Sequence, residues 1–409
     1  MKKIIALMLA LVMVLALAAC GADTPEGSAK PAEDASDLKI GVVLIGDENS
    51  GYDSAHIDGI VTAAEACGIT EDQIIWKYNV QEDESCFDSI NDLVAQECTT
   101  VFSDSYGHQS YMQQAAEENP EVIFVAMTGD TAATTDLTNF KNAFNKTYES
   151  RYVSGVVAGM KLKELVDAGE VGDSNKDDDG NIMIGYVGAY PYAEVVSGYT
   201  AFYLGVKSIV DNVVMNVSYT NSWYDPTAEA TAANSLVSSG CIIISQHADS
   251  TGAPSECQTM LAGGTTVYCV GYNIDMLTVA PDAALTSAQN NWSIYYTYAF
   301  NQLLNGEELD TDWSAGYNED AVMISEIGAS AAEGTAEKVA EVEAALKDGS
   351  LHVFDCSKFT VNGENLSSYT EAYGMNGQES IVDGVFADST LRSAPYFDLR
   401  IDGITELNA

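Results

Sequence analysis

Aromatic side chains stand beside acids, hydroxyls and amides at several places where apolar, strand-like runs end. An aromatic ring can stack on the flat face of a ligand, and its polar neighbours can hydrogen-bond the edge of the same ligand. A single tyrosine of this kind is better explained as a plug at the end of a sheet. The recurrence of the pattern in both halves of the chain, however, favours a ligand cleft. The residues that carry it are Asp47, Tyr52, Asp53, Tyr106, Thr128, Trp223, Tyr272 and Asn273.

Few residues are arranged for catalysis. The chain has 4 histidines, and no GxSxG, Walker A or GxGxxG motif follows a strand-like run. A glycosidase built on two carboxylates stays open because acids are abundant, although no pair of them stands out. We therefore expect a binding protein without a cofactor, and not an enzyme.

The charge balance excludes another class of function. Asp and Glu number 61 against 17 Lys and Arg, which gives a net charge of −44. So acidic a surface repels nucleic-acid phosphates, and it offers no basic patch for an anionic membrane. The length of 409 residues and the apolar content of 46% are enough for two or three domains with real cores.

The N-terminus has the pattern of an export signal. Two lysines precede an apolar run, residues 4–17, that is too short to span a bilayer comfortably. The run ends in Leu17-Ala18-Ala19-Cys20, which resembles a bacterial lipobox. We expect residues 1–19 to be a signal peptide and residues 20–38 a flexible tether that begins with a lipidated Cys20. The lipid would hold the protein at the extracytoplasmic face of the cell membrane. A secretory signal with a chance cysteine is the alternative.

Strand-like and helix-like runs alternate along the body of the chain. Such alternation predicts an α/β fold with two doubly wound lobes, each built on a mostly parallel sheet. The expected strands are 39–45, 74–78, 99–103, 122–127 and 140–144 in one lobe, and 182–187, 213–219, 241–245 and 267–270 in the other.

Three crossings of the chain should join the lobes, near residues 145–150, 286–290 and 310–320. The first lobe is then residues 39–147 plus 288–312. The second lobe is residues 148–287 plus 313–409, which includes a C-terminal extension.

Two further features leave alternatives open. Seven cysteines follow Cys20, and their pairing cannot be assigned from spacing. Asn175, Asp177 and Asp179 alternate as in the start of a calcium-binding loop, but the twelfth position is Tyr186 where a glutamate is expected. A solvated acidic turn is the preferred interpretation.

Several segments, taken in order, resemble one family of solute-binding proteins. They are Gly51-Tyr-Asp-Ser-Ala-His-Ile-Asp-Gly59, Tyr152-Val-Ser-Gly-Val-Val-Ala-Gly159, Trp223-Tyr-Asp-Pro226 and Leu285-Thr-Ser287. Over residues 39–300 the chain resembles the BMP (basic membrane protein) family, the lipoprotein solute-binding subunits of ABC importers, whose best understood members are purine nucleoside receptors. The resemblance implies a two-lobed fold of the periplasmic type I class, joined by a three-crossing hinge.

The resemblance also implies roles for individual residues. Tyr52 stands where the family has a stacking phenylalanine, and Trp223 where it has the opposing aromatic. Asp53 stands where the family has an asparagine that meets the base. The aromatic sandwich is therefore expected to persist.

The polar positions of the family pattern are changed. Thr128 stands where the family has an acid, and Tyr272 followed by Asn273 replaces a second acid. Asn290 stands where the family has a lysine. A nucleoside-like or other flat ligand with a less charged rim is the expectation.

The sequence thus predicts a lipid-anchored solute-binding protein that delivers a small molecule to an ABC permease. A surface interaction protein or signalling receptor on the same fold is the alternative, and a secreted hydrolase is a weaker one.

Overall fold

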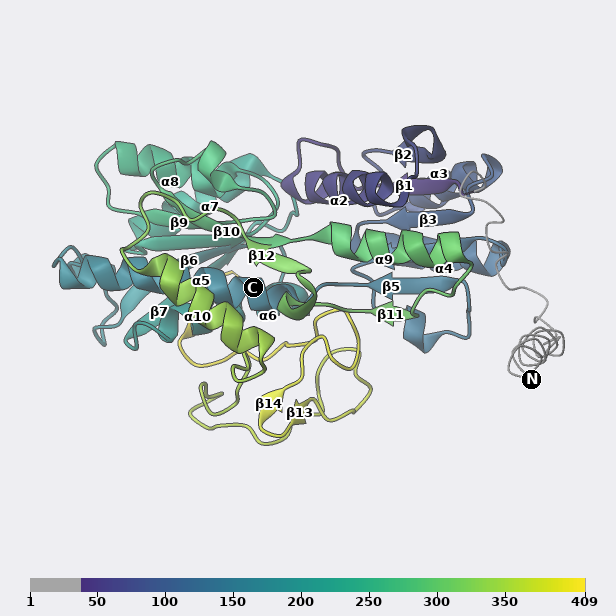
Figure 1. Cartoon of the computed structure of the whole chain (residues 1–409). Coiled ribbons are helices and arrows are strands. Elements are labelled where there is room, and N and C mark those ends of the chain that lie inside the picture. The colour runs from purple at the N-terminus through teal and green to yellow at the C-terminus, as the bar shows by residue number, and fades with distance from the viewer. Residues whose placement is uncertain (1–37, 409) are drawn as a thin grey trace, which may run out of the picture.

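The structure, a computed structural model, describes residues 38–408, which form two α/β lobes (Figure 1). The six strands of the first lobe pair only in parallel, in the order β11-β5-β4-β3-β1-β2. Their bounds are β1 (Ile40–Val43), β2 (Ile74–Lys77), β3 (Thr100–Ser103), β4 (Ile123–Met127), β5 (Phe140–Ala143) and β11 (Asp312–Trp313). The helices of this lobe are α2 (Gly51–Cys67), α3 (Glu84–Ala95), α4 (Gln109–Glu118) and α9 (Trp292–Asn305).

The second lobe holds a seven-stranded sheet in the order β12-β10-β9-β8-β6-β7-β15, in which only β12 is antiparallel to its neighbour. Its strands are β6 (Ile182–Gly188), β7 (Val213–Tyr219), β8 (Ile243–His247), β9 (Tyr268–Tyr272), β10 (Ala284–Asn290), β12 (Val322–Ile324) and β15 (Ile404–Glu406). Its helices are α5 (Thr147–Asp167), α6 (Ala193–Lys207), α7 (Pro226–Ser238), α8 (Gly252–Ala262) and α10 (Thr335–Lys347). The expected fold class, two mostly parallel α/β lobes, is confirmed.

Local signals explain where the helices that carry site residues begin. Asp225 caps α7, because its Oδ1 accepts hydrogen bonds from the backbone N–H groups of Thr227 and Ala228, and Pro226 fits the first helical position. α2 is capped by Ser50, whose Oγ accepts from the N–H of Asp53. Asp53 therefore lies in the first turn of α2.

The chain crosses between the lobes three times. It passes from β5 into α5, from β10 into α9, and from β11 towards β12. Residues 288–290, expected in the first lobe, are the end of β10 in the second sheet. Asn290 joins two of the crossings, since its Oδ1 accepts hydrogen bonds from Thr147 Oγ1 at 2.8 Å and from Asn145 Nδ2 at 3.3 Å.

A C-terminal extension follows α10 and packs on the second lobe, as the yellow end of the chain in Figure 1 shows. It contains the short hairpin of β13 (Ile381–Val382) and β14 (Val385–Phe386), and it ends in β15, which adds to the sheet beside β7. Phe354 and Phe397 stack with ring centroids 4.3 Å apart, and both are buried. The extension is thus part of the core of the second lobe.

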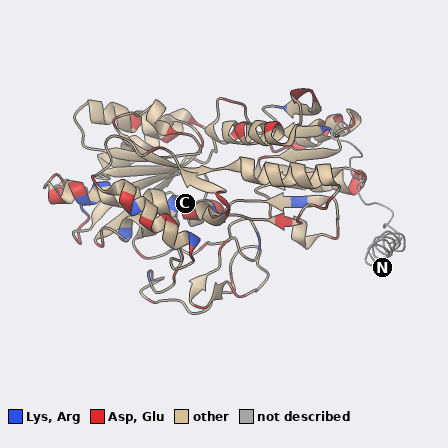
Figure 2. Ribbon diagram, viewed as in Figure 1, with Lys and Arg blue, Asp and Glu red and all other residues tan. Residues whose placement is uncertain are grey.

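Acidic side chains are spread over both lobes, and few basic ones accompany them (Figure 2). All seven cysteines among residues 38–408 are free thiols, and six of them are buried. In the acidic turn, Asp177 Oδ1 accepts hydrogen bonds from the N–H groups of Asp179 and Asn181, and Asn175 Oδ1 accepts from Gly172. These oxygens are occupied by the turn itself, and the described part of the chain holds no cluster of three or more His, Cys, Asp or Glu suited to a metal ion.

The signal peptide and Cys20 lie outside the described residues. Within residues 38–408, no helix combines the length and the apolar character needed to cross a membrane.

Two glycines let α5 and α6 pack with their backbones in contact. A Cβ built on Gly155 would lie 2.2 Å from the carbonyl oxygen of Phe202, and one built on Gly205 would lie 2.2 Å from that of Tyr152. Such contacts are too short for any real side chain, so the two helices would have to separate. This packing matters for the site because α5 and α6 carry Arg151 and Glu194, whose positions are described below.

We predict that Gly155→Ala lowers the free energy of unfolding by about 1–3 kcal/mol, the usual cost of overpacking. Urea denaturation followed by circular dichroism measures it. Gly172→Ala is the matched control, because the nearest atom to its new Cβ lies 3.8 Å away and the change should stay below about 1 kcal/mol. Equal effects of the two substitutions would contradict the packing argument.

Candidate ligand-binding site

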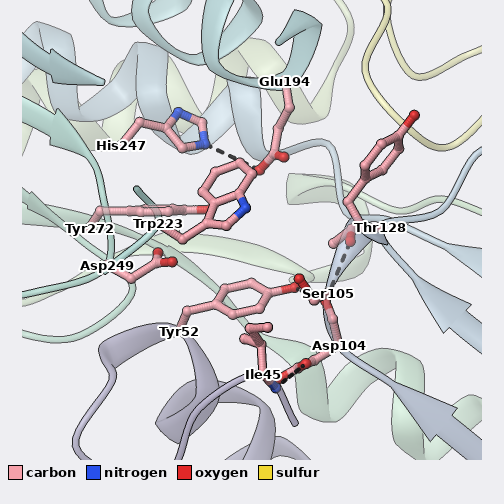
Figure 3. A pocket seen from close by; sticks show the side chains of 11 residues that line it. Ile45, Tyr52, Asp104, Ser105, Thr128, Glu194, Trp223, His247, Asp249 and Tyr272 are labelled. Carbon is pink, nitrogen blue, oxygen red and sulfur yellow. Dashed lines mark hydrogen bonds and ion pairs between the residues drawn. The ribbon is translucent and has the colours of Figure 1, made fainter. Parts of the chain in front are cut away.

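A cavity of about 370 Å³ lies between the lobes, at the carboxyl ends of strands from both sheets (Figure 3). In open α/β sheets this is the edge at which ligands bind. The first lobe lines the cavity with Ile45, Tyr52, Asp104, Ser105, Tyr106 and Thr128, and the second with Glu194, Trp223, His247, Asp249 and Tyr272.

Tyr52 and Trp223 come from different lobes and lie one above the other in the cavity (Figure 3). Tyr52 is fixed by its hydroxyl, which donates to the carbonyl oxygen of Asp104 at 2.5 Å. Trp223 is supported from behind by Tyr190, with ring centroids 5.3 Å apart and an interplanar angle of 66°. The two rings are therefore held in place by the protein's own contacts.

Burial favours the protonated form of two acids of the cavity. Burial, and then the neighbouring charge of Asp53, raise the pKa of Asp104 well above its ordinary value. Burial, and then the charge of Glu229, do the same to the pKa of Asp249. Asp104 Oδ1 accepts from the N–H of Ile45 at 3.0 Å, and Asp249 Oδ1 accepts from Asn273 Nδ2 at 2.9 Å. A protonated carboxyl can both donate and accept, so each side chain can meet either kind of group on a ligand.

His247 is neutral and orders the opposite wall. Burial, and then the charge of Arg151, lower its pKa to about 4. The neutral ring accepts from the hydroxyl of Tyr186 at Nδ1 and donates from Nε2 to Glu194 Oε1 at 3.2 Å. This tautomer leaves the second oxygen of Glu194 for a ligand.

Arg151 lies behind the cavity and supports Tyr272. Its guanidinium carbon is 3.6 Å from the centre of the Tyr272 ring, a cation–π contact, and its Nη1 donates to the carbonyl oxygen of Gln246 at 2.6 Å. Arg151 is fully buried, and no carboxylate within residues 38–408 pairs with it, so the ring of Tyr272 and the carbonyl of Gln246 take the place of a counter-ion.

Residues 39–348 match the family model described as ABC transporter substrate-binding protein, PnrA-like. The chain belongs to this family. The resemblance expected from the sequence is thereby confirmed for the Bmp/PnrA-like proteins, and the family and the fold are those of extracytoplasmic solute-binding proteins that bind small ligands and a permease.

Relatives of this PnrA-like protein differ in what their names say they bind. A purine-binding protein of Brucella abortus is 29% identical over 354 residues, which cover 85% of this chain and 93% of the relative. A putative ABC transporter glucose-binding protein of Haloferax volcanii is 28% identical over 284 residues, 68% of this chain and 65% of that protein. Among solved structures, an ABC transporter solute-binding protein from Aeropyrum pernix has a TM-score of 0.61 at 14% identity, over 81% of this chain and 94% of that one, which shows the shared fold.

Five of the residues expected to bind ligand line the cavity, namely Tyr52, Tyr106, Thr128, Trp223 and Tyr272. Four others lie elsewhere, and each is occupied by the protein itself. Asp47 is in an exposed loop, where its carboxylate accepts from the side chains of Asn49 and Asn79. Asp53 is buried behind the cavity and accepts from the N–H of Gly46. Asn273 orients Asp249, and Asn290 belongs to the hinge.

Six lining residues were not singled out from the sequence: Ile45, Asp104, Ser105, Glu194, His247 and Asp249. Four of them follow β1, β3 or β8 within two residues, and His247 is the last residue of β8. Considering every residue at the carboxyl end of a predicted strand would therefore have included all five. Glu194 lies in the first turn of α6, and only the fold brings it to the site.

Three acids line the cavity, Asp104, Glu194 and Asp249, and none of them is at Thr128 or Tyr272, where the resemblance places the family's acids. Burial favours the protonated forms of Asp104 and Asp249, so the charge of the cavity is smaller than the number of its acids.

We predict that Asp104→Asn has a higher free energy of unfolding than the parent protein, and that this difference grows as the pH increases from 5 to 8. The pKa of Asp104 is raised, so the folded state keeps a proton that the unfolded state releases. Each pH unit between the ordinary and the raised pKa therefore lowers the parent's stability by about 1.4 kcal/mol, and the amide removes this slope. Denaturant unfolding at several pH values measures the difference.

Asp47→Asn is the control: Asn49 and Asn79 lower the pKa of that carboxyl, so it titrates below pH 5 in both the folded and the unfolded state, and its stability profile should run parallel to that of the parent between pH 5 and 8. Parallel pH profiles for the parent and Asp104→Asn would show that Asp104 is ionised in the folded protein.

Proposed function

We propose that this PnrA-like protein captures a flat heterocycle, a purine base or a nucleoside-like relative of one, and presents it to an ABC permease. The observation that carries the proposal is the pair of aromatic rings, Tyr52 and Trp223, that come from different lobes to one cavity with carboxyl groups around it. Aromatic faces stack on a planar ring, and the carboxyl groups can then meet its edge.

The chemistry of the cavity supports this class of ligand. The edge of a purine alternates hydrogen-bond donors and acceptors. Protonated Asp104 and Asp249 can serve both kinds of group, and Glu194 can accept from a donor. The name of the Brucella abortus relative agrees with a purine, whereas the sugar in the name of the Haloferax volcanii relative does not require two opposed rings.

The mechanism follows from the distribution of the lining residues over two lobes. A ligand that contacts both walls favours the closed arrangement of the lobes, which shifts the population from open to closed. The crossings at Asn145, Thr147 and Asn290 are hydrogen-bonded to one another, so the lobes are joined at a defined hinge. The permease would recognise the closed form.

We predict that Tyr52→Ala and Trp223→Ala each weaken the binding of adenine about tenfold to a hundredfold, because stacking on one aromatic contributes on the order of 1–3 kcal/mol. Isothermal titration calorimetry measures the dissociation constants. Tyr52→Phe is the matched control, since it keeps the ring and loses only the hydrogen bond to Asp104; it should stay within about fivefold of the parent. If the parent fails to bind adenine, or if both alanine variants bind it as tightly as the parent, the purine assignment is wrong.

We also propose that Cys20 is lipidated and holds the protein at the outer face of the membrane. The support is the segment Leu17-Ala18-Ala19-Cys20 at the end of the apolar run. We predict that Cys20→Ala leaves the protein either unprocessed or released from membranes, as membrane fractionation and intact-mass measurement would show. A processed Cys20→Ala protein that still fractionates with membranes would contradict the lipid anchor.

A further inference from the structure

The C-terminal extension of this chain reaches the ligand cleft. The match to the family ends at residue 348, so residues 349–408 lie beyond the part shared with the family model. Tyr373, Arg392 and Pro395 of the extension nevertheless line a cavity beside the first one. The cleft of this protein therefore has a wall that the family match does not include.

This second cavity is larger than the first and lies directly beside it. Tyr106, Thr128 and Glu194 line both. If the head of a ligand lies between Tyr52 and Trp223, a tail that extends past Tyr106, Thr128 and Glu194 would lie in the second cavity.

A buried carboxyl group fixes the new wall on the second lobe. Asp388 is fully buried, and its Oδ1 accepts from the N–H groups of Tyr396 and Phe397 at 2.6 and 3.0 Å. Its Oδ2 accepts from the hydroxyl of Ser197, on α6, at 2.6 Å. The segment that carries Arg392 and Pro395 is therefore held rigidly, as a preorganised binding surface must be.

The same segment also touches the first lobe. Arg392 forms an ion pair with Asp130 at 3.2 Å, with both side chains only 11% exposed. The N–H of Ser393 donates to Asp312 Oδ2 at 2.8 Å. Because the extension is fixed to one lobe and contacts the other, the second cavity is complete only when the lobes are closed.

The chemistry of the second cavity disfavours an anionic occupant. Arg392 is already paired with Asp130, and Arg400 is paired with Glu406, so an anion would have to displace an existing partner. Glu194 and Asp398 add acidic side chains to the lining. The rings of Tyr192 and Tyr373 are instead open, with 48% and 67% of these residues exposed. Open aromatic rings and paired charges suit an uncharged tail that has carbon faces for stacking and hydroxyls for the polar rim, as a sugar has.

We propose that residues 349–408 add a second ligand subsite, which takes an uncharged glycosyl tail that extends beyond a single sugar of a nucleoside-like solute. The inference rests on the proposed function, because it assumes that the head of the solute occupies the first cavity.

The test is a set of titrations of the full chain with adenine, adenosine, AMP and two adenosine disaccharides that carry a second ribose at O2′ or at O5′. At least one disaccharide should bind ten times more tightly than adenosine, and AMP, whose tail is anionic, should gain nothing over adenosine. Tyr373→Ala should remove the gain of the disaccharide and change the affinity for adenine less than twofold. Tyr78→Ala, which removes an exposed tyrosine outside both cavities, should change neither affinity.

Three results would overturn the subsite: neither disaccharide binds more tightly than adenosine, Tyr373→Ala weakens adenine and the disaccharide equally, or AMP gains tenfold. In those cases adenine still binds in a manner that depends on Tyr52 and Trp223, so the proposed function stands alone. If adenine itself does not bind, the proposed function fails and the subsite fails with it.

Discussion

The acids that meet between the lobes set the conditions under which this molecule can close. Asp104 lies beside Asp53 in the first lobe, and Asp249 in the second lobe feels the charges of Glu229, Asp53 and Glu194, so the closed cleft brings carboxyl groups of both lobes together in a place with little water. Ionised together, they would repel one another without solvent to screen them, and the lobes would be driven apart. Protons on Asp104 and Asp249 relieve the repulsion. Hydrogen-bond donors on a ligand can do the same, which couples binding to closure through the same atoms.

Basic residues are few in this chain, and its arginines lie close to the acids of the cleft. The chain has three arginines, Arg151, Arg392 and Arg400, and all of them lie at or behind the cleft. Arg151 supports a wall of the first cavity through the ring of Tyr272, while Arg392 and Arg400 line the second cavity and pair with Asp130 and Glu406. Arginine suits these positions because its flat, weakly hydrated head can be buried against rings and carbonyls. In a protein of net charge −44, the guanidinium groups thus help to hold the walls of the cleft in place.

The protein keeps the two-lobed plan of its family but changes what surrounds the ligand. Tyr52 and Trp223, the pair that the resemblance predicts for stacking, both line the cavity, and its acids are Asp104, Glu194 and Asp249. The extension beyond residue 348 then adds a second wall at the mouth of the cleft. A solute-binding fold tolerates such changes because its sheets hold the strand ends in place while loops and additions alter the surface between them.

The amino-acid sequence by itself determined the two α/β lobes, the starts of helices such as α7 at Asp225-Pro226, and the placement of Tyr52 and Trp223 at strand ends. These follow from hydrophobic periodicity and capping, which act between residues that are close along the chain. Only the tertiary structure decided that Asp47 faces solvent while Asp104 enters the cavity, that Glu194 arrives from α6, and that the extension closes the cleft. The direction of a loop side chain, and the partner that a segment meets across the cleft, depend on residues far away along the chain. In the extension, strands of two or three residues leave almost no periodicity to read, so the sequence pattern carried no sign of where it would pack.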